Sequence, residues 1–293
     1  MENIPLPTKV EVKKSKENKN KASIIIEPCY PGYGITLGNA LRRVLLSSLK
    51  GGALVAVKIK GVHHEFSTIP YVKEDVVDII LNLKQLRLRI EGDNLEMLHL
   101  DVKGEKKVKA SDIKTPPNVE IANPDLEIAT LTDKKAHLEM KLWAKSGRGY
   151  LPSEEQEKRE WEVDTITMDS IFTPIVNVGF KVENTRVGER TDFEKLILDI
   201  ETDGTITPEE ALKKSALILV RHFNFVVSGE EEKKEVSELE EGEKKVERED
   251  EEKGEKGKEK KQKEAKKTKK VKKETKTKPK GKSEKKSGGK KKK

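Results

Sequence analysis

The chain has 293 residues, a formal net charge of +8 and 33% apolar residues. The charge comes from residues 229–293, which hold 27 basic and 18 acidic side chains, whereas residues 1–228 sum to −1. The basic isoelectric point therefore describes the C-terminal segment, and it does not mark the body of the chain as a nucleic-acid-binding domain.

Cysteine content and hydropathy restrict the compartment in which the chain works. A single cysteine, Cys29, excludes an internal disulfide and fits a reducing environment. The N-terminal residues lack the apolar core of a signal peptide, and the apolar run at 216–220 is far too short to cross a bilayer. We expect a cytoplasmic chain that does not enter a membrane.

The first part of the chain predicts a strand, a turn and a helix. "KASIIIEP" at 21–28 has strand composition, and "PGYG" at 31–34 is typical of a turn. The pattern then predicts a helix over 37–49, with Thr36 as its N-cap and Gly51-Gly52 as its end.

The middle of the chain is rich in short strands. Alternating residues at 53–62 predict a half-buried strand, and "KEDVVDIILNLKQL" at 73–86 predicts a helix. Residues 87–145 alternate short strand patterns with Gly, Pro and Asn turns. Strand patterns return at 161–168 and 175–184.

The last folded stretch combines a strand with a well-marked helix. Residues 195–200 alternate, with Leu196, Leu198 and Ile200 on one side. Thr207, Pro208 and Glu210 then form a predicted capping box at the start of a helix. Its apolar stripe is Leu212, Ala216, Leu219, Phe223 and Val226. Because helices and strands are segregated, we expect an α+β fold with mainly antiparallel sheets.

The predicted helix at 37–49 has an unusually wide apolar face. At about 100° per residue, six positions cover about half its circumference. These are Leu37, Ala40, Leu41, Val44, Leu45 and Leu49. Arg43 and Leu46 lie outside that arc, beside Asn39. Such a helix can touch two different partners, but a deeply buried core helix with one stray leucine explains the same pattern.

Spacings typical of catalytic, metal or cofactor sites are missing. Gly32, Gly34 and Gly38 match neither a dinucleotide fingerprint nor a P-loop, and a turn before a helix explains them. His63 and His64 are adjacent, so on a strand they point to opposite faces and cannot share a metal. We therefore expect no catalytic residue, no metal and no cofactor in this chain.

The C-terminal segment is a block polyampholyte. Residues 229–252 carry −8 and residues 253–293 carry +17. With five apolar residues and no aromatic in 229–293, the segment cannot bury enough surface to offset its ordering entropy, so we predict disorder. Two interpretations remain: a solvated tail, or a lysine-rich segment that binds nucleic-acid phosphates without sequence preference.

Three long stretches carry a family resemblance. "EPCYPGYGITLGNALRRVLLSSL", "GVHHEFSTIPYVKEDVVDIILNLK" and "VENTRVGERTDFEKLILDIETDGTITPEEALKKSALIL" resemble the alpha subunit of bacterial DNA-dependent RNA polymerase, and the resemblance covers residues 20–228. It implies a nucleoid-associated homodimer that scaffolds the beta and beta-prime subunits of a nucleotidyltransferase working in transcription. The active site of that enzyme lies in the large subunits.

The resemblance also implies a division of the chain and roles for single residues. Residues 1–50 and 177–228 correspond to a dimerisation subdomain, and 51–176 to an inserted, mostly β subdomain. The family's beta contacts fall on Arg43, Leu46 and Asp78, and a beta-prime contact on Lys84. The dimer interface is assigned to Leu37, Leu41, Val44, Leu45, Leu212, Leu219 and Phe223.

The segment after residue 228 departs from the family. Alpha subunits usually continue into a small helical domain that binds promoter DNA, and the tail has no apolar pattern of that kind. Residues 253–293 are instead the candidate for nonspecific DNA contact. An alternative function is a free-standing dimeric nucleic-acid-binding protein that acts through this basic tail, although the body shows no basic, aromatic-interleaved face.

Overall fold

The computed structural model describes residues 4–16, 18–156 and 161–229. The tail predicted from residue 229 lies, apart from Gly229, outside the described residues. Those up to Phe223 cluster into one compact unit, and residues 224–229 continue and end the last helix. The sheets are antiparallel and the helices few, which confirms the predicted α+β fold.

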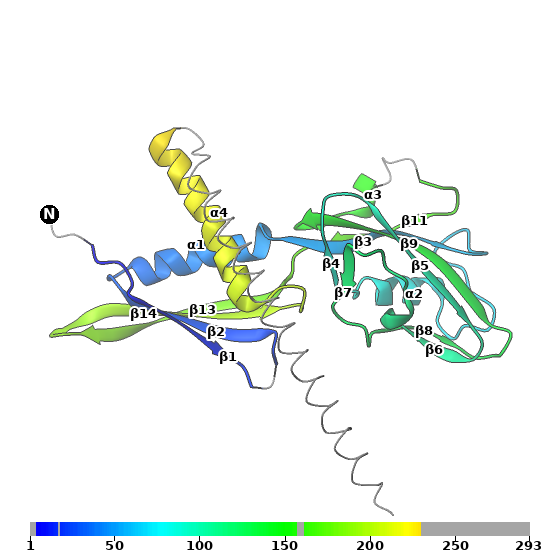
Figure 1. Cartoon of the computed structure of the whole chain (residues 1–293), viewed down its shortest axis with the longest axis horizontal. Coiled ribbons are helices and arrows are strands. Elements are labelled where there is room, and N and C mark those ends of the chain that lie inside the picture. Colours follow the sequence, from blue (N-terminus) through cyan, green and yellow to red (C-terminus); the bar gives the residue numbers. More distant parts are fainter. Residues whose placement is uncertain (1–3, 17, 157–160, 230–293) are drawn as a thin grey trace, which may run out of the picture. The chain divides into compact units, whose positions relative to one another are not determined.

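One sheet has four strands in the order β1-β2-β14-β13. They are β1 (Lys9–Lys14), β2 (Lys21–Cys29), β13 (Ile175–Val187) and β14 (Arg190–Thr202). Leu196, Leu198 and Ile200 are buried on one face and Asp199 is exposed on the other, as the alternation predicts. Helix α1 (Tyr33–Ser47) lies along β13 and β14 (Figure 1).

The predicted limits of the first helix are wrong at both ends. α1 begins after Gly32, whose φ of 85° only glycine adopts readily, and Thr36 lies inside the helix. The hydroxyl of Thr36 donates to the carbonyl of Gly32 at 3.1 Å instead of capping. The helix ends at Ser47, and Gly51-Gly52 belong to the next strand, β3 (Lys50–Ile59). The start was missed because the carboxylate that accepts from the first amides of the helix belongs to a distant residue, Glu194.

Gly34, predicted in a turn, and Gly38, inside the predicted helix, both lie within α1, where they allow close packing. A Cβ on Gly38 would stand 2.6 Å from the ring of Phe180, and one on Gly34 would stand 2.7 Å from the carboxylate of Glu194. Both distances are below van der Waals contact. The missing side chains therefore let α1 lie directly on β13 and β14.

Helix α4 (Pro208–Ser228) begins with the predicted capping box. The amide of Glu210 donates to the hydroxyl of Thr207 at 3.3 Å, and the amide of Thr207 donates to the Glu210 carboxylate at 3.2 Å. The first half of the apolar stripe packs against the core that α1 shares with the sheet. Its second half is exposed: 62% at Phe223 and 79% at Val226.

A second sheet has the order β5-β9-β3-β4-β7, with β11 paired to β3. Besides β3, its strands are β4 (Leu88–Ile90), β5 (Glu96–Lys103), β7 (Val119–Ile121), β9 (His137–Arg148) and β11 (Ile166–Thr167). Helix α2 (Val76–Leu83) is shorter than the predicted 73–86. It starts later because Asp75 caps it by accepting from the amide of Asp78. The strand predicted at 161–168 is reduced to β11.

Small elements complete the described chain. They are β6 (Lys106–Lys109), η1 (Ala110–Asp112), β8 (Glu127–Leu131), β10 (Tyr150–Leu151), α3 (Ser153–Gln156) and β12 (Ser170–Ile171). The largest buried cluster draws on residues 54–168, and a separate cluster joins residues 24–49 to 175–219. The subdomain limits at 50/51 and 176/177 stay predictions. None of the described helices is long and apolar enough to span a membrane.

Candidate subunit-contact surface

The outer face of α1 is the first candidate surface. It consists of Ile35, Asn39, Arg42, Arg43 and Leu46, all exposed. Their spacing of four, three, one and three residues keeps them on one side of a helix. Arg43 and Leu46, which the helical wheel had separated from the apolar arc, therefore do not contribute to the chain's own core. Their role toward another subunit stays a prediction.

The sheet and a remote carboxylate hold the opposite side of α1. Leu41 and Leu45 are 6% and 0% exposed, and they pack into the core formed with β2 and β14. At the N-terminus of the helix, the Glu194 carboxylate accepts from the amide of Gly32 at 2.9 Å and of Gly34 at 2.8 Å. A negative charge there satisfies free amides and favours the helix dipole.

The residues around Glu194 have no sequence pattern that would have distinguished them. Tyr30 packs edge-on against Phe193 with ring centroids 6.2 Å apart, and the Arg190 guanidinium lies 5.1 Å from the Phe193 centroid. Asp192 holds Arg190 in place with two hydrogen bonds, of 3.0 and 2.7 Å. The same contact keeps the pKa of the Asp192 carboxyl below its ordinary value. This cluster fastens the β13–β14 hairpin beside the start of α1.

The outer face of α1 is cationic. The helix contains no acidic residue, and no ion pair within the described part of the chain involves Arg42 or Arg43. Many of the lysines, in contrast, have a carboxylate partner, such as Lys50 with Asp93 at 3.0 Å. Two guanidinium groups flanked by exposed apolar side chains suit a partner that supplies carboxylates.

Asp78 and Lys84 lie at opposite ends of α2. Asp78 is exposed in the first turn. Lys84 instead pairs with Asp169 at 3.0 Å, and its side chain is 32% exposed. Asp169 also accepts from the amide of Ser153 at 3.0 Å. These two donors, the amide first, lower the pKa of Asp169 below its ordinary value.

The predicted dimer residues fall into three groups. Leu41 and Leu45 are buried within the chain's own core, so they do not contact another chain directly and can only hold α1 in position for an interface. Leu37, Val44, Leu212 and Leu219 are half-buried, and Phe223 is exposed. The exposed apolar residues of α4 are Val220, Phe223, Phe225, Val226 and Val227. Such a concentration of apolar side chains is typical of a surface that another protein covers.

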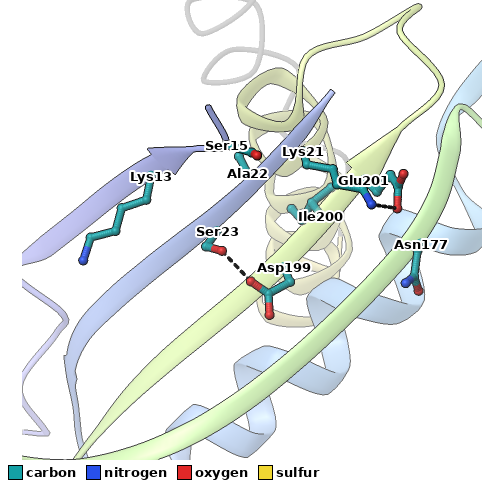
Figure 2. A pocket seen from close by; sticks show the side chains of 9 residues that line it. All are labelled: Lys13, Ser15, Lys21, Ala22, Ser23, Asn177, Asp199, Ile200 and Glu201. Atoms are coloured by element: carbon teal, nitrogen blue, oxygen red, sulfur yellow. Dashed lines mark hydrogen bonds and ion pairs between the residues drawn. The ribbon is translucent and has the colours of Figure 1, made fainter. Parts of the chain in front are cut away.

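The face of the four-stranded sheet away from the helices carries the polar side chains of Ser23 and Asp199 beside the apolar side chains of Ile25 and Ile197. A hollow of about 320 Å³ opens on it. Figure 2 shows the residues that line it, with the helices behind the strands. The hydroxyl of Ser23 donates to Asp199 at 2.5 Å, and Lys21 pairs with Glu201 at 3.0 Å. Gly179, opposite Asp199 in the register, adds no side chain. Four polar side chains of the hollow are therefore bound in two pairs, and we assign the hollow no function.

The described residues contain no group of three or more His, Cys, Asp or Glu side chains placed to hold a metal ion. Cys29 is fully buried, and burial raises the pKa of its thiol above the ordinary value. Its sulfur contacts the carbonyl of Ile26 at 3.6 Å. This thiol therefore has the character of a small core residue.

Comparison with known proteins gives a consistent result. Residues 57–173 match the family model described as the RNA polymerase Rpb3/RpoA insert domain. The chain is 47% identical over 223 residues to the DNA-directed RNA polymerase subunit alpha of Carboxydothermus hydrogenoformans, covering 76% of this chain and 71% of the relative. It is 48% identical over 224 residues to that of Oceanobacillus iheyensis, with the same coverage. The subunit of Symbiobacterium thermophilum is 47% identical over 228 residues, with 78% and 72% covered.

Proposed function

Because the chain belongs to the family of DNA-directed RNA polymerase alpha subunits and hence to the transcription machinery, we propose that it homodimerises and scaffolds the beta and beta-prime subunits. The active site of the polymerase then lies in the large subunits, and this chain contributes no catalytic residue, metal or cofactor. Its place of action is the cytoplasm, on the nucleoid.

The observation that supports the proposed dimer is the exposed apolar part of α4. Side chains as large as Phe223 and Phe225 are more than half exposed there, and burial of such groups drives association. A second copy presents the same helix, so a twofold axis would cover both apolar surfaces at once. Leu212 and Leu219 on α4, together with Leu37 and Val44 on α1, are half-buried and would complete the interface.

The contacts with the large subunits are assigned to two helices. Arg43 and Leu46 on α1, with Asp78 on α2, are proposed to bind beta, and Lys84 to bind beta-prime. The exposure of Arg43, Leu46 and Asp78 supports this assignment. Lys84 is already paired with Asp169. A contact with beta-prime would therefore either bring a second carboxylate to Lys84 or involve Lys84 and Asp169 together.

The test measures mass and composition of the full chain, alone and with its large subunits. Light scattering should give a dimer for the wild type. Phe223→Asp should shift it to monomer at micromolar concentration, because it places a charge in the apolar interface. Phe66→Asp is the matched control, since Phe66 is exposed to 79% and lies far from α4 in the sequence. A wild-type monomer, or equal effects of the two substitutions, would refute the dimer interface.

We further propose that residues 253–293 hold DNA electrostatically, on the strength of their +17 charge. Deletion of 253–293 should flatten the salt dependence of DNA binding by the assembled polymerase, because fewer counterions would be released. Equal salt slopes with and without the tail would contradict this role. Binding to DNA by a dimer that captures no large subunit would instead favour the free-standing nucleic-acid-binding protein.

A further inference from the structure

Ile35 is an exposed apolar side chain on α1 to which neither the core nor the proposed contacts assign a role. It is 54% exposed, compared with 39% for Leu46. The two residues are eleven positions apart, which is three turns of a helix within about 20°. They therefore face the same way, about 16 Å apart along the axis.

The residues between these two apolar ends define a charge pattern. Arg42 and Arg43 lie close to Leu46 on the same side and have no ion pair within the described residues. The side-chain amide of Asn39 donates back to the carbonyl of Ile35 at 3.1 Å. The face thus presents an apolar group, an internally bonded amide, two guanidinium groups and a second apolar group.

We propose that Ile35 is a second apolar anchor for the beta subunit, and that the beta surface beneath it carries a carboxylate between two apolar patches. This inference rests on the proposed function, because Arg43 and Leu46 belong to the same face. An exposed isoleucine gains free energy when it is buried, and the guanidinium groups require acceptors once water is removed.

Charge favours a different protein over a second copy of this chain as the occupant. Two copies joined through this face would bring Arg42 and Arg43 of one helix against those of the other. Since α1 has no acidic residue to offset them, like charges would oppose each other. A partner with carboxylates at this position has the complementary charge.

The test uses the full chain with Ile35→Asp and the purified beta subunit of the same polymerase. Ile35 is the third residue of α1, where an acidic side chain favours the helix dipole, so the unfolding midpoint should not fall. Affinity for beta should drop at least tenfold while the dimer mass is unchanged. Ile171→Asp is the matched control, because Ile171 is exposed to 53% and lies on β12; it should leave beta affinity within twofold of the wild type.

A second substitution tests the predicted charge of the partner. Ile35→Lys removes the same apolar group and should weaken beta binding less than Ile35→Asp, because a lysine is attracted to the partner's carboxylate. Equal losses of beta affinity for the two substitutions would refute the proposed carboxylate on the beta surface. If Arg43→Ala weakens beta binding but Ile35→Asp leaves it unchanged, Ile35 is not an anchor for beta. Failure of the wild type to bind beta at all would instead refute the proposed function.

Discussion

Gly38 offers a direct test of how α1 is seated on the sheet. Gly38→Ala would place a Cβ 2.6 and 2.8 Å from two ring carbons of Phe180 and 3.0 Å from a methyl group of Leu196. Phe180 is half-buried and Leu196 is fully buried. The helix must therefore lift from the sheet, or the two side chains must leave their positions.

Two opposing effects set the magnitude. Alanine is the better helix former by about 1 kcal/mol. Overpacking a filled site costs about 1–3 kcal/mol, and three atoms within 3.0 Å put this site near the upper end. We expect Gly38→Ala to lower the free energy of unfolding by about 2 kcal/mol, against the direction that helix propensity alone predicts.

Urea unfolding of the full chain, followed at a fixed protein concentration, measures this effect. A loss of about 2 kcal/mol should lower the midpoint by about 1 M if the slope is about 2 kcal/mol/M. Gly179→Ala is the control, because a Cβ there meets nothing within 4 Å; it should be neutral or stabilising by about 0.4–1 kcal/mol. A stabilised Gly38→Ala protein would refute the reasoning, and partial rescue by Phe180→Leu would support it.

Two further predictions concern the candidate contacts. Arg43→Ala should leave the dimer mass unchanged and weaken capture of beta by about 2–5 kcal/mol, roughly 30-fold or more, in a binding titration; loss of the dimer would place Arg43 in the other interface. Asp169→Asn should destabilise the chain near pH 7 by at most about 1 kcal/mol, since both partners of the Lys84 pair are about one-third exposed. The lowered pKa of Asp169 means that its contribution is present above the ordinary value of 3.8 and is lost as the pH falls through the lowered pKa, so thermal unfolding of the two proteins should converge in acid. A constant difference down to pH 2 would contradict that assignment.

Local chemistry was sufficient to predict several elements of the fold. The alternation at 195–200 gave the buried face of β14, because side chains on a strand alternate with a period of two. Thr207 and Glu210 gave the start of α4, because both halves of a capping box lie within one turn. The helical wheel identified Arg43 and Leu46 as outward-facing from periodicity alone.

The sequence by itself thus determined the fold class, the capping box of α4 and the outward direction of Arg43 and Leu46. Tertiary structure decided where α1 begins, since its cap is Glu194, a residue 160 positions away from Gly34. It also decided that Gly34 belongs to the helix, and that Lys84 is held by Asp169. The physical reason is the same in each case. These contacts join residues that are distant in the chain, and no local sequence pattern indicates which distant side chain makes the contact.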